Sequence, residues 1–442
     1  MSAKFIFYVG TGLLAITGSA VATQTPAAAT RAVPVDAFLD SLGVDTHISQ
    51  GYNYTNYIPA LRYLGLRAIR DSTKRPDGLL AVHRATGVRA DIGNAGDLPE
   101  LLRVGHILAA AGALLSFEGA NEPNNFPITY HGKRGGSFKS WVAVAEFQRD
   151  LYASVKRDPV LRSYPVFHVS EGGAEADNVG MQWLTIPDGA GTVMPAGTKY
   201  ADYANPHNYV IGNCGRYLDN DSWQAADPVL NKCWDGLYGE YGRTWAKRFP
   251  GYSDAALQTL PRVTTETGWD SVSDPGGETV QGKVLTNTYL AQYARGWTYT
   301  FIYELGDGEG SSGHQGLFHA DWTPKLAATY IHNLTTILAT AQATPAAAAM
   351  GEAANTLAYT IPDKPATVHD LLMQKPDGSF ALAVWGEQVT GVNDVTLALG
   401  SRHAQVRVYD ITSGTAPVRT LADVDRVPLT LSDHALIVEI TP

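Results

Sequence analysis

The sequence contains little cysteine, no excess of positive charge and no long apolar run after its first residues. Only 2 cysteines occur in 442 residues, and the formal net charge is -10. Two cysteines without clustered histidines make a poor zinc site. A negatively charged chain repels a polyanion, so nucleic acid is not expected as a partner. No internal repeat is present, and no glycine-rich phosphate loop follows an early strand pattern.

The remaining composition is that of an ordinary globular protein. Hydrophobic residues make up 45% of the chain and charged residues 17%, which excludes a disordered or fibrous protein. The length allows one large domain and a small one.

Residues 1–22 have the pattern of an export signal. Lys4 supplies a positive charge, Phe5–Ile16 is apolar, and a small-x-small pattern ends at Ala22. We expect cleavage there, a spacer over 23–34, and a secreted or periplasmic protein with no membrane span after cleavage. The apolar run is short for a span, but an uncleaved N-terminal anchor is the alternative.

The two cysteines, Cys214 and Cys233, are expected to form a disulfide in that oxidising compartment. Two free, buried thiols are the alternative.

Short strand patterns alternate with amphipathic helical patterns over residues 35–340. The strands are expected at Leu42–Ile48, Leu66–Arg70, Val88–Ile92, Leu114–Gly119, Val166–Ser170, Tyr203–Pro206, Arg262–Thr265 and Thr298–Glu304. Helices are expected from Tyr54, at Gly78–Ala85, Leu98–Ala111 and Ser137–Lys156, and from a cap at Thr323 to about Ala339. Eight such alternations predict an α/β protein with a (β/α)8 barrel. A doubly wound open sheet is the alternative.

An alanine-rich stretch at 341–354 is expected to be a linker, because the pattern beyond it changes to strands only. These strands are expected at Ser379–Trp385, Val395–Leu399, Gln405–Tyr409 and Ala435–Ile440. They predict a small all-β sandwich domain over 355–442.

Two glutamates follow or end barrel strands. The fourth strand leads into Gly-Ala-Asn-Glu-Pro-Asn at 119–124, and the seventh ends in Thr-Glu-Thr-Gly-Trp at 265–269. Side chains at the carboxyl ends of barrel strands form the site in this fold, so Glu122 and Glu266 should meet across one pocket. Retaining glycoside hydrolysis needs such a pair, about 5–5.5 Å apart, with one acid protonating the leaving oxygen and the other carboxylate attacking the sugar.

These motifs resemble those of glycoside hydrolase clan A, which includes cellulase-like and β-xylosidase-like barrels. The Asn-Glu-Pro run at 121–123 looks like the acid/base signature of the clan, and the run at 265–269 looks like its nucleophile strand. The resemblance spans about Val44 to Leu334. It implies a retaining mechanism on β-glycosidic bonds, with Glu122 as general acid/base and Glu266 as nucleophile.

The resemblance also implies roles for neighbouring residues. Arg70 is similar to the arginine beside the nucleophile, and His207 and Tyr209 resemble the histidine and tyrosine near it. A guanidinium beside Glu266 would favour the ionised form that attack requires, although a purely structural ion pair is the alternative. Asn121 is expected to bind the sugar 2-hydroxyl.

Aromatic residues are expected to contact the sugar. Trp269 is interpreted as a stacking platform, with core packing as the alternative. Many clan members place a tryptophan at the end of the eighth strand, where this chain has Tyr303. We expect Tyr303 to replace it.

Further acidic and aromatic residues are candidates for the same site. Glu118 is expected to be a structural partner inside the barrel, Glu171 is the rival acid, and Glu304 and Asp307 are expected to bind hydroxyls or line the rim. Trp183, Trp223 and Trp234 either form outer subsites or hold long loops in place. The insert 211–245 is expected to shape one wall of the cleft.

The sequence therefore predicts a monomeric glycosidase that acts on a polysaccharide or oligosaccharide without a metal ion or cofactor. A barrel that binds polysaccharide without cleaving it, and a transglycosylase that uses the same intermediate, are the alternatives. The C-terminal domain either binds glycan or packs against the barrel. Sugar identity and endo or exo action are not readable from these motifs.

Overall fold

The computed structural model describes residues 29–136, 140–170, 179–210, 216–230, 237, 252–309, 313–339 and 355–441. The predicted export signal and linker lie outside the described residues, as do Cys214, Cys233, Glu171 and Trp234. Within the described ranges, no helix combines the length and apolar character that crossing a membrane requires.

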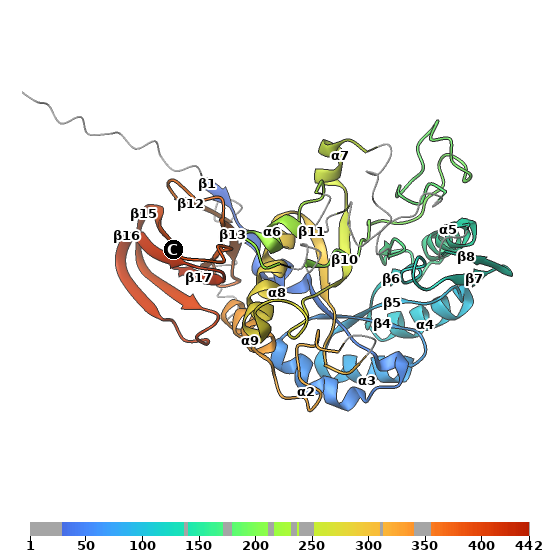
Figure 1. The fold of residues 1–442 in the computed structure, drawn as a ribbon, viewed down its shortest axis with the longest axis horizontal. Helices are drawn as coiled ribbons and strands as arrows, with labels where there is room; N and C mark the ends of the chain where they lie inside the picture. Colours follow the sequence, from blue (N-terminus) through green and yellow to red (C-terminus); the bar gives the residue numbers. More distant parts are fainter. Residues whose placement is uncertain are drawn as a thin grey trace, which may run out of the picture.

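A parallel sheet forms the centre of the larger domain (Figure 1). Its strands, in order, are β10 (Arg262–Thr267), β11 (Trp297–Ile302), β3 (Leu42–Asp45), β4 (Ala68–Ser72), β5 (Arg89–Gly93), β6 (Leu114–Glu118) and β9 (Val166–Phe167). Parallel bridges from Phe167 to Tyr203 and from Ala204 to Arg262 connect β9 to β10. The predicted sixth strand is reduced to these bridges, and the sheet closes into the predicted (β/α)8 barrel.

The barrel interior is filled by apolar side chains at one end and polar side chains at the other. The apolar cluster takes one residue from each of five strands: Ala68, Leu115, Phe167, Val263 and Phe301. The buried polar residues Arg70, Glu118 and Thr265 follow two or three positions later on their strands, toward the carboxyl ends. The barrel is therefore closed below a polar pocket, as is usual for this fold.

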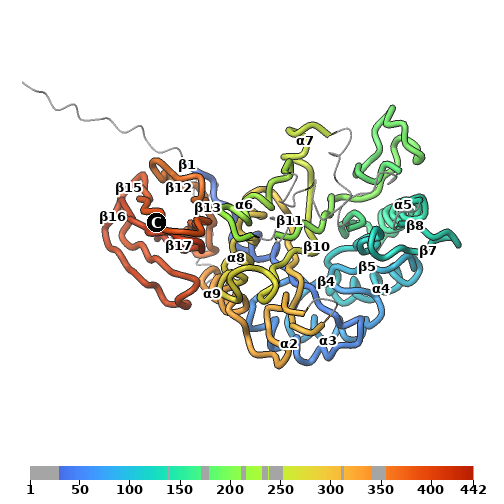
Figure 2. Tube along the Cα trace, viewed as in Figure 1, coloured from blue at the N-terminus to red at the C-terminus, as the bar shows by residue number. Residues whose placement is uncertain are grey.

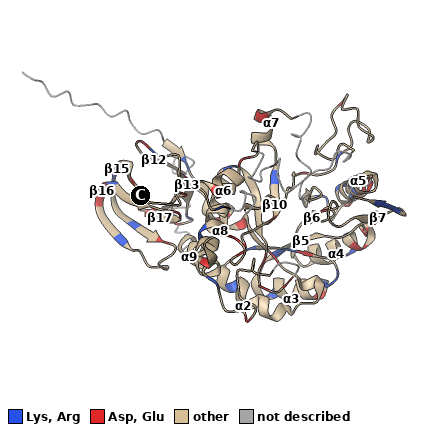
Figure 3. Ribbon diagram, in the orientation of Figure 1, with Lys and Arg blue, Asp and Glu red and all other residues tan. Residues whose placement is uncertain are grey.

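Helices surround the barrel (Figure 2). They are α2 (Tyr54–Leu64), α3 (Pro76–Thr86), α4 (Leu98–Ala110), α5 (Val142–Arg157), α6 (Asp221–Ala225), α8 (Gly277–Ala294) and α9 (Leu326–Leu338), with the shorter α1 (Val35–Asp40), η1 (Ile48–Gln50) and α7 (Asp254–Thr259). Helices α3 and α4 each have an acidic and a basic residue (Figure 3).

The expected start of the last helix is wrong by a few residues. Helix α9 begins at Leu326 with Lys325 as N-cap and no side-chain cap. The Thr323 hydroxyl instead donates to Asp321 Oδ1, so it stabilises the turn before the helix.

The C-terminal domain is an eight-stranded sheet. Its strands are β12 (Thr356–Thr360), β13 (Val368–Gln374), β14 (Phe380–Gly386), β15 (Asn393–Asp410), β16 (Arg419–Leu431) and β17 (Ala435–Ile440), together with β1 (Ala29–Arg31) and β2 (Val33–Pro34). Residues from β12 to β17 share one apolar cluster, so the sheet folds over on itself as the predicted sandwich does.

Residues 29–34 differ from the expected spacer. Strand β1 pairs with β12, and β2 pairs with β13. The segment before the barrel is thus part of the C-terminal sheet, because its backbone groups complete two edges of that sheet.

The two domains share a continuous apolar core. Met373, Trp385 and Ile437 of the sheet belong to the same buried cluster as the barrel helices. Helix α8 packs against α9, β13 and β17, so it is enclosed between the barrel and the β-domain.

Candidate active site

Glu122 and Glu266 lie on opposite sides of one pocket at the carboxyl end of the barrel. Glu122 follows β6 by four residues, and Glu266 is in β10. An oxygen of each glutamate and a ring nitrogen of His207 all lie within 4.8 Å of one another. The residues that the sequence paired are therefore brought together.

His207 links the two carboxylates. Its Nδ1 lies 2.8 Å from Glu122 Oε1 and 3.5 Å from Glu266 Oε2. Its Nε2 lies 3.0 Å from the Thr265 hydroxyl, which donates to Glu118 at 3.0 Å. The fully buried imidazole ring is therefore held at both nitrogens.

The backbone holds Glu122 in an unusual conformation. Its φ is 37°, in the left-handed region that residues other than glycine rarely adopt. Its N–H donates to the Ser170 carbonyl at 2.9 Å, and its carbonyl accepts from Asn125 and Phe126 N–H. These three bonds offset the conformational cost, and such cost is frequent at functional sites.

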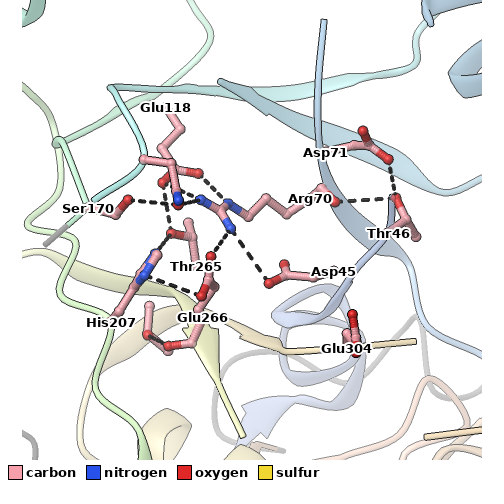
Figure 4. A network of polar contacts seen from close by, with 12 residues as sticks. Asp45, Thr46, Arg70, Asp71, Glu118, Ser170, His207, Thr265, Glu266 and Glu304 are labelled. Atoms are coloured by element: carbon pink, nitrogen blue, oxygen red, sulfur yellow. Dashed lines mark hydrogen bonds and ion pairs between the residues drawn. The ribbon is translucent and has the colours of Figure 1, made fainter. Parts of the chain in front are cut away.

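Arg70 organises the other half of the pocket (Figure 4). Its guanidinium donates to both oxygens of Glu118, at 2.6 and 3.0 Å, and to Glu266 Oε1 at 2.6 Å. A further bond of 2.6 Å reaches Asn121 Oδ1. Arg70 thus sets the positions of three side chains from two other strands and the loop after β6, and Glu118 is its structural partner, as expected.

Glu266 has a second donor. The Tyr209 hydroxyl donates to Glu266 Oε2 at 2.9 Å. Burial and the charge of Glu266 raise the pKa of Tyr209 well above its usual value, so the phenol stays protonated. Both oxygens of Glu266 therefore accept hydrogen bonds, while 12% of its side chain remains exposed.

Protonation in the pocket is shared between Glu122 and His207. Burial acts against the imidazolium, but the charge of Glu266 and the hydrogen bond to Glu122 outweigh it and raise the pKa of His207. Burial acts against the Glu122 carboxylate, but His207, Asn125 and Arg70 outweigh it and lower its pKa. The favoured state is an imidazolium between two carboxylates.

Asp45, at the end of β3, is a further buried acid beside Arg70. Its Oδ2 lies 3.6 Å from Arg70 Nη1, and neither of its oxygens has a hydrogen-bond partner among the residues that the structure describes. Burial raises the pKa of Asp45 well above the usual range, Arg70 opposes this effect, and Glu266 and Glu118 add to it. The neutral form of Asp45 is therefore favoured more than in a free aspartic acid.

Tyr303 lies at the end of the eighth strand and is half-buried. Its ring meets the ring of His47 edge to face, with centroids 5.5 Å apart. His47 Nδ1 lies 3.3 Å from Glu304 and 3.8 Å from Glu309. Glu304 is fully buried and lies against His47.

Trp269 does not have the expected role. Its side chain has no exposed surface, and its ring packs edge to face against Tyr217 at 6.0 Å. A sugar can stack only on an accessible ring face, so Trp269 is a core residue, and its interpretation as a platform is wrong.

The described part of the 211–245 insert does not form a cleft wall. Helix α6 packs on α8, and Asp227 pairs with Arg295, which precedes β11. Trp223 stacks on His369 of the β-domain, with centroids 4.0 Å apart. Residues 216–230 therefore run along the outside of the barrel, and Trp223 holds the domains together. Trp183 is buried as well.

Several residues of the site carry no motif that sequence reasoning could use. Asn205 accepts from the Thr265 backbone and donates to Glu118, and Asn125 donates to Glu122 at 2.8 Å. Asparagine and threonine are common near strand ends. Only their position beside the two glutamates identifies them.

No protein-family model matches the sequence, and no curated protein matches it. Solved structures match over nearly the whole chain. A family 39 glycoside hydrolase from the gut symbiont Bacteroides cellulosilyticus WH2 is 15% identical, with a TM-score of 0.56 over 92% of this chain and 82% of that chain. A family 30 subfamily 8 xylanase from Clostridium acetobutylicum is 10% identical, with a TM-score of 0.53 over 95% and 97%.

A GH51 arabinofuranosidase from Xanthomonas axonopodis pv. citri is 12% identical, with a TM-score of 0.51 over 95% and 98%. These three families belong to clan A. At such identities the likeness shows the fold alone, so this chain shares its overall fold with these three solved structures.

Proposed function

We propose that the protein is a retaining glycosidase that cleaves β-glycosidic bonds of a polysaccharide or oligosaccharide. One observation carries the proposal: carboxylate oxygens of Glu122 and Glu266 lie within 4.8 Å of each other across a single pocket. Double displacement needs two carboxyl groups about 5–5.5 Å apart, whereas inversion needs about 6.5–9.5 Å to admit a water molecule. The β-preference comes from the resemblance to clan A.

Glu266 is the proposed nucleophile. Arg70 and Tyr209 each donate to one of its oxygens, which orients the carboxylate for attack. In the first step a Glu266 oxygen bonds to the anomeric carbon as the glycosidic C–O bond breaks. The leaving oxygen takes a proton from Glu122.

The proton for this step is held by the Glu122–His207 pair. The raised pKa of His207 keeps one proton on the pair near neutral pH, and the 2.8 Å contact allows it to pass to Glu122. Once Glu266 is an ester, its charge no longer stabilises the imidazolium. In the second step Glu122 takes a proton from water. The water oxygen bonds to the anomeric carbon, and the bond between that carbon and the Glu266 oxygen breaks.

Asn121 and Tyr303 are the proposed sugar contacts. Arg70 occupies the Asn121 carbonyl oxygen, so the amide N–H groups are directed elsewhere and can donate to the sugar 2-hydroxyl. Tyr303 has a partly accessible ring, which suits stacking on a pyranose C–H face.

A panel of aryl β-glycosides and polysaccharides tests the proposal. We expect at least one member to be hydrolysed, and we expect the double variant Glu122→Gln/Glu266→Gln to be inactive while still binding that substrate. If the protein binds a glycan of the panel but cleaves none of its members, it is a polysaccharide-binding protein and not a glycosidase.

A further inference from the structure

The two glutamates and His207 have the composition of a metal site. Among the residues that the structure describes, they are the one group of histidine and acidic side chains with ligand atoms close enough to share an ion. Imidazole nitrogen and carboxylate oxygen together suit divalent transition metals such as Zn²⁺, Ni²⁺ and Cu²⁺. We call Glu122, His207 and Glu266 the metal triad.

The distances within the metal triad are those of atoms around one ion. His207 Nδ1 lies 2.8 Å from Glu122 Oε1 and 3.5 Å from Glu266 Oε2. Ligands bound to a tetrahedral zinc ion at ~2.0–2.2 Å lie about 3.4 Å apart. The distance from His207 Nδ1 to Glu122 Oε1 is shorter than this value, and the distance from His207 Nδ1 to Glu266 Oε2 is slightly longer. The two glutamate oxygens, within 4.8 Å, need to approach by roughly 1 Å, which rotation of the side chains can supply.

The remaining polar atom of each triad member is held by another residue. Asn125 donates to Glu122 Oε2, Arg70 donates to Glu266 Oε1, and Thr265 contacts His207 Nε2. Glu122 Oε1, Glu266 Oε2 and His207 Nδ1 therefore face one another, and Glu266 Oε2 also accepts a hydrogen bond from the Tyr209 hydroxyl. Outer contacts of this kind orient the ligands of metal sites.

The positive charge of Arg70 opposes a cation in the pocket. Glu118 binds two nitrogens of that guanidinium with both oxygens and offsets its charge. Two carboxylates of the metal triad then remain for one divalent ion.

We infer that the metal triad binds one divalent transition-metal ion of the zinc class, and that the bound ion blocks hydrolysis. The blocking rests on the proposed function, because the ion would occupy the acid's proton position and an oxygen of the nucleophile. The binding itself does not rest on it.

Calorimetric titration of ZnCl₂ into the chelator-treated full chain tests the binding. We expect one ion per chain, with affinity at least about tenfold weaker in His207→Ala and in Glu122→Gln. Zn²⁺ should also raise the unfolding temperature of the parent protein but not of these variants. The absence of a one-per-chain site, or equal affinity in the parent and a folded triad variant, would overturn the inference.

His434→Ala is the matched control. His434 also lies between two aspartates, but Nε2 faces Asp410 at 3.2 Å and Nδ1 faces Asp433 at 3.5 Å. Nitrogens on opposite sides of the ring cannot share one ion, so this variant should keep the affinity of the parent protein. Loss of the site in folded His434→Ala would place the ion away from the metal triad and overturn the inference.

Hydrolysis assays separate the two proposals. Zn²⁺ binding to the triad without hydrolysis of any glycoside refutes the proposed function and leaves the metal site in place. Hydrolysis that continues unchanged at saturating Zn²⁺ overturns the blocking.

Discussion

Buried charges concentrate in two regions of the protein, the barrel mouth and the contact between the barrel and the β-domain. At the domain contact, the acids Asp410 and Asp433 are matched in number by the cations His434 and Lys283. Lys283 of α8 pairs with Asp433 at 2.9 Å, and Glu387 accepts from the backbone of Ser222 and Trp223. Such an arrangement holds two parts together and leaves no charge for a ligand.

At the barrel mouth the acids outnumber the cations. Asp45, Glu118 and Glu266 all face Arg70, and His207 lies between two of the pocket's carboxylates. Buried groups that share too few partners are costly to folding and are frequent at catalytic sites. The comparison teaches that an excess of acids over cations, rather than burial, distinguishes the candidate site from the structural contact.

The largest expected effect comes from removing the proposed nucleophile. Glu266→Ala should lower turnover by roughly 10⁴-fold or more, because no covalent intermediate can form. Azide should restore part of the activity and give a product of inverted configuration. Full activity in the variant would exclude Glu266 as the nucleophile. The barrel mouth would then differ from the domain contact in charge but not in function.

Removing the proposed acid should depend on the substrate. Glu122→Ala should cost about 10²–10⁴-fold with a poor leaving group and much less with an activated aryl group, which needs no proton. The measurement is the first-step rate against leaving-group pKa. Equal losses across the series would argue against an acid role.

His207→Asn should change the pH dependence of kcat/KM. The raised pKa of His207 places the alkaline limb of the parent enzyme where the Glu122–His207 pair loses its proton, above the usual histidine value. In the variant only a carboxyl group holds that proton, so the alkaline limb should move to lower pH. An unmoved limb would show that the pair does not store the proton.

Glu387→Gln should leave turnover unchanged and alter stability. Burial raises the pKa of Glu387 to about 7, although Trp223, Trp385, Ser222 and Arg295 oppose this effect. The folded state therefore binds a proton that the unfolded state has lost, and this contribution disappears as the pH rises from about 4.5 to about 7.

Over that range the parent protein should lose about 3 kcal/mol of unfolding free energy that the variant keeps, since each pKa unit corresponds to about 1.4 kcal/mol. Urea unfolding at several pH values measures both slopes. Equal pH dependence of the unfolding free energy in the parent protein and the variant would contradict the prediction. Altered turnover would show that Glu387 also affects the candidate site.

The sequence predicted the parts of the fold that have a regular pattern. Barrel strands alternate with helices that bury one face, so their positions and the strand-end motifs of Glu122 and Glu266 were readable. Helix α8 was not predicted, because it is buried on nearly all sides from Val280 to Gln292 and has no apolar stripe. Strands β1 and β2 have two or three residues each, too few for a periodicity.

The sequence predicted Arg70, Glu122, His207 and Glu266 but not the residues around them. Asp45 and Asn205 are identified only by distances to residues far along the chain, and Asn125 only by its hydrogen bond to Glu122. Trp269 shows the opposite case: its place after the nucleophile suggested sugar contact, but no sequence pattern shows which way a ring faces.

Trapping the covalent intermediate tests the central claim most directly. A 2-deoxy-2-fluoro glycoside of the sugar found in the panel should inactivate the enzyme, and peptide mass spectrometry should place one sugar on Glu266. A label on Glu118 or Glu122, or hydrolysis with inverted anomeric configuration in the parent enzyme, would contradict the account.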